Sequence, residues 1–147
     1  MKPLPREDTP LKAWIRALER TSNIDQDIFL TLPILIERLA EKFGEAPALF
    51  SEQDRLSYAG LAERSARYAR WALTQGLKAG DVVCLMMSNC AEYATIWLGM
   101  TRISVIVASV NTNLRGPSLA HCINLVSPKL IIVGSDPKIG VQQLNYR

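Results

Sequence analysis

The sequence is poor in the residues that hold metal ions or act as nucleophiles. It has one histidine, His121, and three cysteines, none of them at CxxC spacing. No second ligand accompanies His121 at a spacing typical of zinc, so we expect no metal site. Its neighbour Cys122 points in a different direction on a helix, which excludes a Cys–His pair. We interpret Cys84, Cys90 and Cys122 as small buried thiols of a protein in the reducing cytoplasm.

Glycine is too sparse where a phosphate cradle would need it. Such a loop requires several glycines, because backbone amides must approach the anion without side chains in the way. The segment after the apolar run 82–87 has no glycine, and the segment 111–116 after the next run has one. Arg115 in that second segment is either a phosphate ligand or a loop arginine that pairs with a carboxylate or with backbone carbonyls. No catalytic residue is identified, and any cofactor-binding residues remain unknown.

The chain also lacks an excess of charge of one sign and a long apolar run. Its net charge is +3, and both signs are mixed along the chain, so we expect no nucleic-acid partner. Residues 94–110 are apolar apart from Arg102 and a few small polar residues. A membrane span needs about 20 apolar residues and tolerates a central charge badly. We interpret this segment as a buried helix followed by a buried strand. The first twenty residues are polar and resemble no signal peptide.

Residues 1–27 are predicted to form an N-terminal extension with an amphipathic helix. Apolar residues recur at helical spacing and basic residues lie opposite them. The apolar positions are Leu11, Trp14, Ile15 and Leu18, and the basic ones are Lys12, Arg16 and Arg20. Two interpretations stay open: an ordinary helix packed on the domain, or a helix that lies in a membrane interface.

The rest of the chain is long enough for one domain with one core. Pro33 marks the start of a helix and Gly44 marks its end. Ser57 is expected to cap the second helix. Asn89 is expected to cap the third helix, with Glu92 as its partner in a capping box. The expected order is helix 32–43, strands 48–51 and 56–58, helix 59–75, strand 82–87, helix 90–102, strand 105–110, helix 116–125 and strand 130–133. This alternation predicts an α/β fold with a mainly parallel sheet covered by helices. The unbroken apolar runs predict strands that are buried on both faces.

Several short motifs occur in a characteristic order. They are Leu56-Ser57-Tyr58 with Leu61, Gly80-Asp81-Val82-Val83, Asn89 through Glu92, Trp97-Leu98-Gly99, Asn111-Thr112-Asn113-Leu114-Arg115-Gly116 and Leu119-Ala120-His121-Cys122. Together they resemble the opening of the AMP-binding (adenylate-forming) superfamily. The long-chain and very-long-chain acyl-CoA synthetases, relatives of fatty-acid transport proteins, are most similar. The resemblance implies a partial N-terminal subdomain of the adenylate-forming fold over residues 28–136. Residues 137–147 form a divergent tail.

Two positions depart from the family pattern. The family usually has glutamate at Gly60, where it would close a capping box with Ser57. Glycine there costs that helix roughly 1 kcal/mol. The family favours glycine at Ser104, so a positive φ at this turn would strain the serine.

The resemblance implies a two-step reaction in the family: a fatty-acid-like carboxylate and ATP give an acyl-adenylate, and CoA then displaces AMP. The phosphate loop, the magnesium-site residues and the catalytic lysine of that chemistry have no counterpart here. We therefore expect a truncated ligase that is inactive alone, with ATP, magnesium and CoA as cofactors of the full-length family only. The alternatives are a non-catalytic α/β binding or interaction module and an unrelated nucleotide-binding protein. We expect a cytoplasmic protein that is prone to self-association. Peripheral contact with a membrane follows only from the second interpretation of the N-terminal helix.

Overall fold

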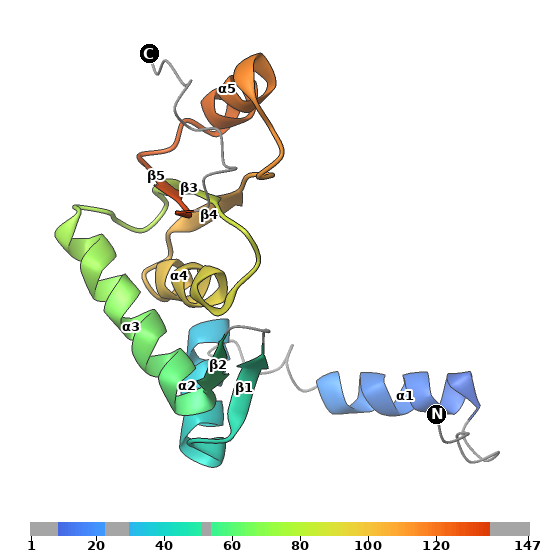
Figure 1. Ribbon diagram of the computed structural model, residues 1–147. Helices are drawn as coiled ribbons and strands as arrows, with labels where there is room; N and C mark the ends of the chain where they lie inside the picture. Colours follow the sequence, from blue (N-terminus) through green and yellow to red (C-terminus); the bar gives the residue numbers. More distant parts are fainter. Residues whose placement is uncertain (1–8, 23–29, 51–53, 136–147) are drawn as a thin grey trace.

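The computed structural model describes residues 9–22, 30–50 and 54–135. Figure 1 shows a sheet between helices, a small hairpin below it, and an N-terminal helix that lies apart. The elements are α1 (Pro10–Thr21), α2 (Leu32–Phe43), β1 (Pro47–Phe50), β2 (Arg55–Ser57), α3 (Tyr58–Thr74), β3 (Val82–Met86), α4 (Ala91–Arg102), β4 (Ile106–Ser109), α5 (Gly116–Val126) and β5 (Leu130–Val133). The predicted sequence of elements is confirmed, with boundaries shifted by at most one residue.

The main sheet is parallel, with strand order β4-β3-β5. β3 pairs with β4 from Val82 opposite Ile106, and with β5 from Val83 opposite Leu130. Side chains alternate along β3: Val83 and Leu85 face a core built with α3 and α4, while Cys84 and Met86 face α5. Figure 1 shows α4 and α5 on opposite sides of the strands. The α/β fold class and the parallel sheet are confirmed.

The prediction that all three strands are buried on both faces is wrong for two of them. Residues 83–86 of β3 are buried, but Ile106 at the start of β4 is 55% exposed and Val133 at the end of β5 is 36% exposed. The core under α5 is centred on Cys84 and Met86 of the central strand, and Ala108 and Ile131 of the outer strands are only partly buried in it. Among the described residues, the outer strands therefore keep apolar side chains in contact with solvent. Val105 is buried but precedes the strand.

A second core joins α2 and the antiparallel hairpin of β1 and β2 to the helix pair. Its buried members are Ile36, Leu56, Leu61, Ala91 and Leu98. Ser57 caps α3 as predicted, since its hydroxyl accepts a hydrogen bond from the Gly60 amide at 3.0 Å. Gly44 ends α2 with a φ of 51°. The hairpin and α2 thus pack on the end of α3 that lies farthest from the sheet.

The predicted cap of α4 is wrong. The helix begins at Ala91, its N-cap residue is Cys90, and no side chain makes a capping hydrogen bond. The Glu92 carboxylate does not close a capping box with Asn89, because Tyr68 and Arg64 of α3 bind it instead. A charged partner across a helix interface offers this carboxylate a stronger contact than a backbone amide.

The turn after α4 requires an unusual backbone. Ser104 has a φ of 57°, in the left-handed region that glycine tolerates and serine resists. The strain expected from the departure at this position is therefore present. The Ser104 carbonyl accepts a hydrogen bond from Gly80, which ties the turn to the start of β3.

The α3–α4 contact is the most extensive contact between helices in the described structure. A Cβ added to Gly99 would lie 2.6 Å from Tyr68 Cβ and 2.7 Å from the Ser65 carbonyl oxygen. Two buried hydroxyls in this contact bind carbonyls of their own helices: Ser65 donates to Ala62, and Thr95 donates to Glu92, both at 2.9 Å. The interface therefore contains polar groups without leaving them unsatisfied.

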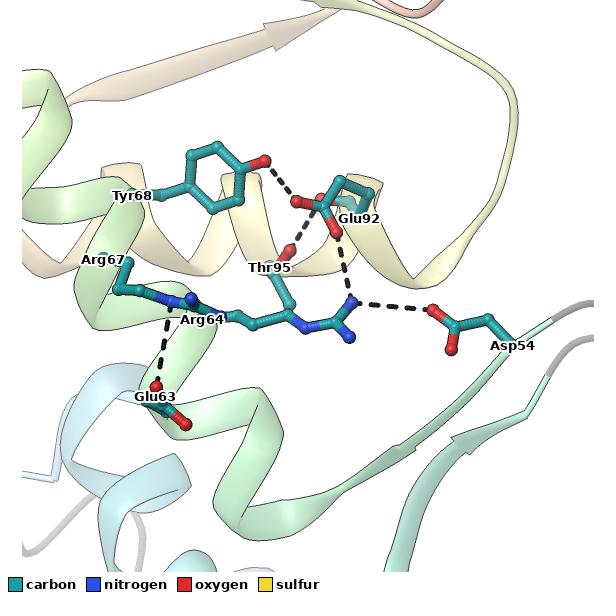
Figure 2. A network of polar contacts seen from close by, with 7 residues as sticks. All are labelled: Asp54, Glu63, Arg64, Arg67, Tyr68, Glu92 and Thr95. Atoms are coloured by element: carbon teal, nitrogen blue, oxygen red, sulfur yellow. Dashed lines mark hydrogen bonds and ion pairs between the residues drawn. The ribbon is translucent and has the colours of Figure 1, made fainter.

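A polar network links the same two helices to the hairpin (Figure 2). The Arg64 guanidinium lies 3.3 Å from Glu92 Oε2 and 3.6 Å from Asp54 Oδ2. The Tyr68 hydroxyl donates to the other oxygen of Glu92. Arg67, one turn along α3, pairs only weakly with Glu63 of the same helix, at 3.9 Å. Arg64 is therefore the residue that joins three elements.

We expect Gly99→Ala to destabilise the fold by about 1–3 kcal/mol, although alanine favours a helix by roughly 1 kcal/mol. The new methyl group would collide with backbone and with a Cβ, and neither can move without separating the helices. Gly60→Ala is the matched control: its Cβ would meet the Leu56 Cδ1 methyl at 2.9 Å, and a side-chain end can rotate away. Urea unfolding followed by circular dichroism measures both. Equal stability of the two variants would contradict this packing.

We expect Arg64→Gln to lower the free energy of unfolding by about 1 kcal/mol, because two half-exposed ion pairs are lost together. Arg67→Gln is the control on the same helix and should change it by less than about 0.5 kcal/mol. The difference should shrink in high salt, which screens exposed ion pairs. Indistinguishable urea midpoints at low salt would show that Arg64 does not hold the hairpin to the helices.

Candidate functional site

A cleft opens where β3 and β4 end, at the carboxyl edge of the parallel sheet. Ligands of open α/β sheets commonly bind at this edge. The cleft has a volume of about 530 Å³ and is lined by Met87, Ser88, Asn89, Tyr93, Ser109, Val110, Asn111 and Thr112. The two loops from the motif-rich part of the sequence thus meet in one place.

The cleft is lined by polar and apolar residues, and none of them is charged. Tyr93 and Ser109 share a hydrogen bond at 2.6 Å that joins α4 to the end of β4. The Asn111 side chain accepts from the Asn113 amide at 2.9 Å and shapes the turn that follows. Hydroxyl and amide groups can orient a ligand by hydrogen bonds. They cannot neutralise the charge of a triphosphate, which proteins bind with cations or glycine-rich loops.

Arg115 does not line the cleft. Its guanidinium donates to the backbone carbonyls of Thr112 and Leu114. This is one of the two possibilities that the sequence left open, namely a loop arginine that pairs with backbone carbonyls. Its role here is to hold the turn before α5 in shape.

The remaining candidate side chains are not brought together. His121 is exposed on α5, and Cys122 beside it is half-buried. Cys84 is buried in β3, where burial raises the pKa of its thiol, while Cys90 is exposed, which corrects the expectation of three buried thiols. Within residues 9–22, 30–50 and 54–135, no three metal-ligating side chains form a cluster.

The Gly80-Asp81 motif is structural. The Asp81 carboxylate accepts hydrogen bonds from Lys129 Nζ at 2.8 Å and from the Lys78 amide at 2.7 Å. The bond from Lys129, and then the one from Lys78, hold the pKa of this carboxyl below its usual value. Lys129 directly precedes β5, so the ion pair fixes the entry of β5 beside β3.

A second cleft, of about 490 Å³, lies over the polar network of Figure 2. It is lined by Arg64, Arg67, Tyr68, Trp71 and Glu92. Burial, and then the hydrogen bond to Glu92, raise the pKa of Tyr68 to about 12, so the phenol stays protonated and donates at neutral pH. The sequence analysis missed this group. The spacing of four between Arg64 and Tyr68 puts them on one helix face, but nothing in the sequence shows that Glu92 lies opposite.

Known proteins resemble the chain over most of its length. Residues 36–145 match the AMP-binding enzyme family. The long-chain-fatty-acid–CoA ligase of Salmonella typhimurium is 31% identical over 129 residues, which are 85% of this chain and 23% of that protein. Long-chain fatty acid transport protein 6 of Mus musculus is 42% identical over 86 residues, 58% of this chain and 14% of that protein. The chain therefore spans less than a quarter of the length of either relative.

Solved structures agree on the fold. The N-terminal domain of FACL13 from Mycobacterium tuberculosis matches with a TM-score of 0.68 at 22% identity, over 73% of this chain and 28% of that one. The N-terminal subdomain of NpsA from Klebsiella oxytoca matches with a TM-score of 0.66 at 20% identity, over 71% of this chain and 28% of that one. These matches and the match of residues 36–145 lead to one conclusion: the chain belongs to the AMP-binding enzyme family and has the fold of part of its N-terminal subdomain.

Proposed function

We propose that this chain supplies the N-terminal part of an ATP-dependent ligase that joins CoA to long-chain fatty acids. The observation that carries the proposal is the similarity to a long-chain-fatty-acid–CoA ligase across 85% of the chain. ATP, magnesium and CoA would be the cofactors of the longer protein, and a fatty-acid-like carboxylate its substrate. The reaction would take place in the cytoplasm, at its boundary with a membrane.

We further propose that the chain alone does not form an acyl-adenylate. The cleft at the carboxyl edge offers hydroxyl and amide groups but no cation among its lining residues. Its one nearby arginine, Arg115, is bound to backbone carbonyls. The non-catalytic module is the less favoured alternative, because the similarity to ligases runs through both loops that form the cleft.

Isothermal calorimetry with millimolar ATP and magnesium should show no saturable heat for the isolated chain, because nothing in the cleft neutralises the phosphates. A dissociation constant of tens of micromolar would contradict this.

A chimera of the Salmonella ligase that carries residues 28–135 in place of its own aligned segment tests the ligase role. If it folds by circular dichroism, it should form acyl-CoA. A folded but inactive chimera would count against the proposal.

Self-association of the isolated chain is also part of the proposal. Three apolar side chains are exposed on the side of the sheet that α5 covers. They are Ile106 of β4, Leu125 of α5 and Val133 of β5. β4 and β5 are the edges of the three-stranded sheet, and an unpaired edge is a template for pairing with another chain.

We expect size-exclusion chromatography to show oligomers at high concentration, and Ile106→Lys to shift them toward monomer, because a charge at the edge opposes pairing. Trp97→Lys, which changes an exposed apolar residue on α4 instead, is the control. A monodisperse wild-type monomer that does not bind a hydrophobic dye would contradict the prediction.

A further inference from the structure

The N-terminal helix α1 presents an apolar face that no described part of the chain covers. Leu11 and Trp14 are 66% and 64% exposed, and Ile15 and Leu18 are 43% and 51% exposed. No residue of α1 is buried, and Figure 1 shows the helix apart from the other elements. The interpretation as an ordinary helix packed on the domain therefore has no support in the described structure.

The helix is defined by its own sequence rather than by packing. The Thr9 hydroxyl accepts from the Lys12 amide, Pro10 occupies the first helical turn, and the Thr21 hydroxyl binds carbonyls of the last turn. A helix of 12 residues is marginal in water without an apolar surface to lie on. Its four large apolar side chains are thus available to such a surface.

The charges of α1 indicate which surface it is. Lys12, Arg16 and Arg20 lie on the face opposite the apolar residues, and Glu19 is the only acidic residue of the helix. An apolar face backed by cations fits a membrane interface with anionic headgroups, where each cation near the surface strengthens binding. Trp14 belongs to the residue type that sits best at the headgroup boundary. None of the described helices is long and apolar enough to span a bilayer.

We propose that α1 binds the surface of membranes that contain anionic lipids. Leu11, Trp14, Ile15 and Leu18 enter the headgroup boundary, and Lys12, Arg16 and Arg20 contact the headgroups. This attachment holds the rest of the chain beside the bilayer, where long-chain fatty acids partition. The attachment requires neither ATP nor an acyl substrate, so it stands or falls independently of the proposed ligase role.

The test is co-sedimentation of the full chain with phosphatidylcholine vesicles, with and without phosphatidylglycerol. We expect stronger binding to the anionic vesicles and loss of that binding in high salt. Leu18→Glu should weaken binding about tenfold, because it removes a large apolar side chain from the interface. Arg16→Gln and Arg20→Gln should each weaken it about fivefold on anionic vesicles only.

Two matched variants serve as controls. Leu73→Glu changes an exposed leucine on α3, and Arg70→Gln changes an exposed arginine on the same helix. Neither should alter binding. Unchanged sedimentation after deletion of residues 1–27, or equal losses in the α1 variants and these controls, would overturn the proposal. If the wild type formed a dimer that Leu18→Glu dissociates, and did not bind vesicles, the apolar face of α1 would be a contact between two copies of the chain. That result would overturn the proposal as well.

Discussion

The close approach of α3 and α4 at Gly99 is the constraint on which the rest of the structure depends. Because no side chain separates the backbones there, Ala72, Ile96 and Met100 can pack directly against β3. The same approach brings Tyr68 and Arg64 within reach of the Glu92 carboxylate. One small residue thus sets both the apolar core beneath the sheet and the polar network at its side.

That helix pair also decides where a ligand can approach. α4 begins two residues after the loop that lines the cleft, and its Tyr93 reaches across to Ser109 at the end of β4. The position of α4 against α3 therefore fixes one wall of the cleft. The opposite wall is the turn that Asn111 and Arg115 stabilise through bonds to the backbone. Hydrogen bonds of uncharged side chains thus hold both walls, and none of the residues that line the cleft is charged.

Periodicity and turn chemistry predicted the elements well, because they depend on near neighbours in the chain. The caps at Ser57 and Gly44 follow from what each residue must do at its own helix end. The positive φ of Ser104 was expected from the glycine that the family favours at that position. The errors concern contacts between distant segments. The predicted capping box of Asn89 and Glu92 is absent, because the Glu92 carboxylate binds partners 24 and 28 residues away in the sequence. The burial of β4 and β5 depends on their positions in the sheet, which are set by distant segments.

The same amphipathic pattern has opposite outcomes at α1 and α3. α3 buries Leu61 and the small residues Ser65, Ala69 and Ala72, which let α4 approach, while α1 carries large apolar side chains and buries none. Small side chains favour helix–helix contact, since their packing needs a precisely shaped partner. Large flexible ones adapt to any apolar surface, including a fluid one. The small residues of α3 thus identify a face that packs closely against another helix, whereas the four large apolar side chains of α1 suit a surface outside the domain.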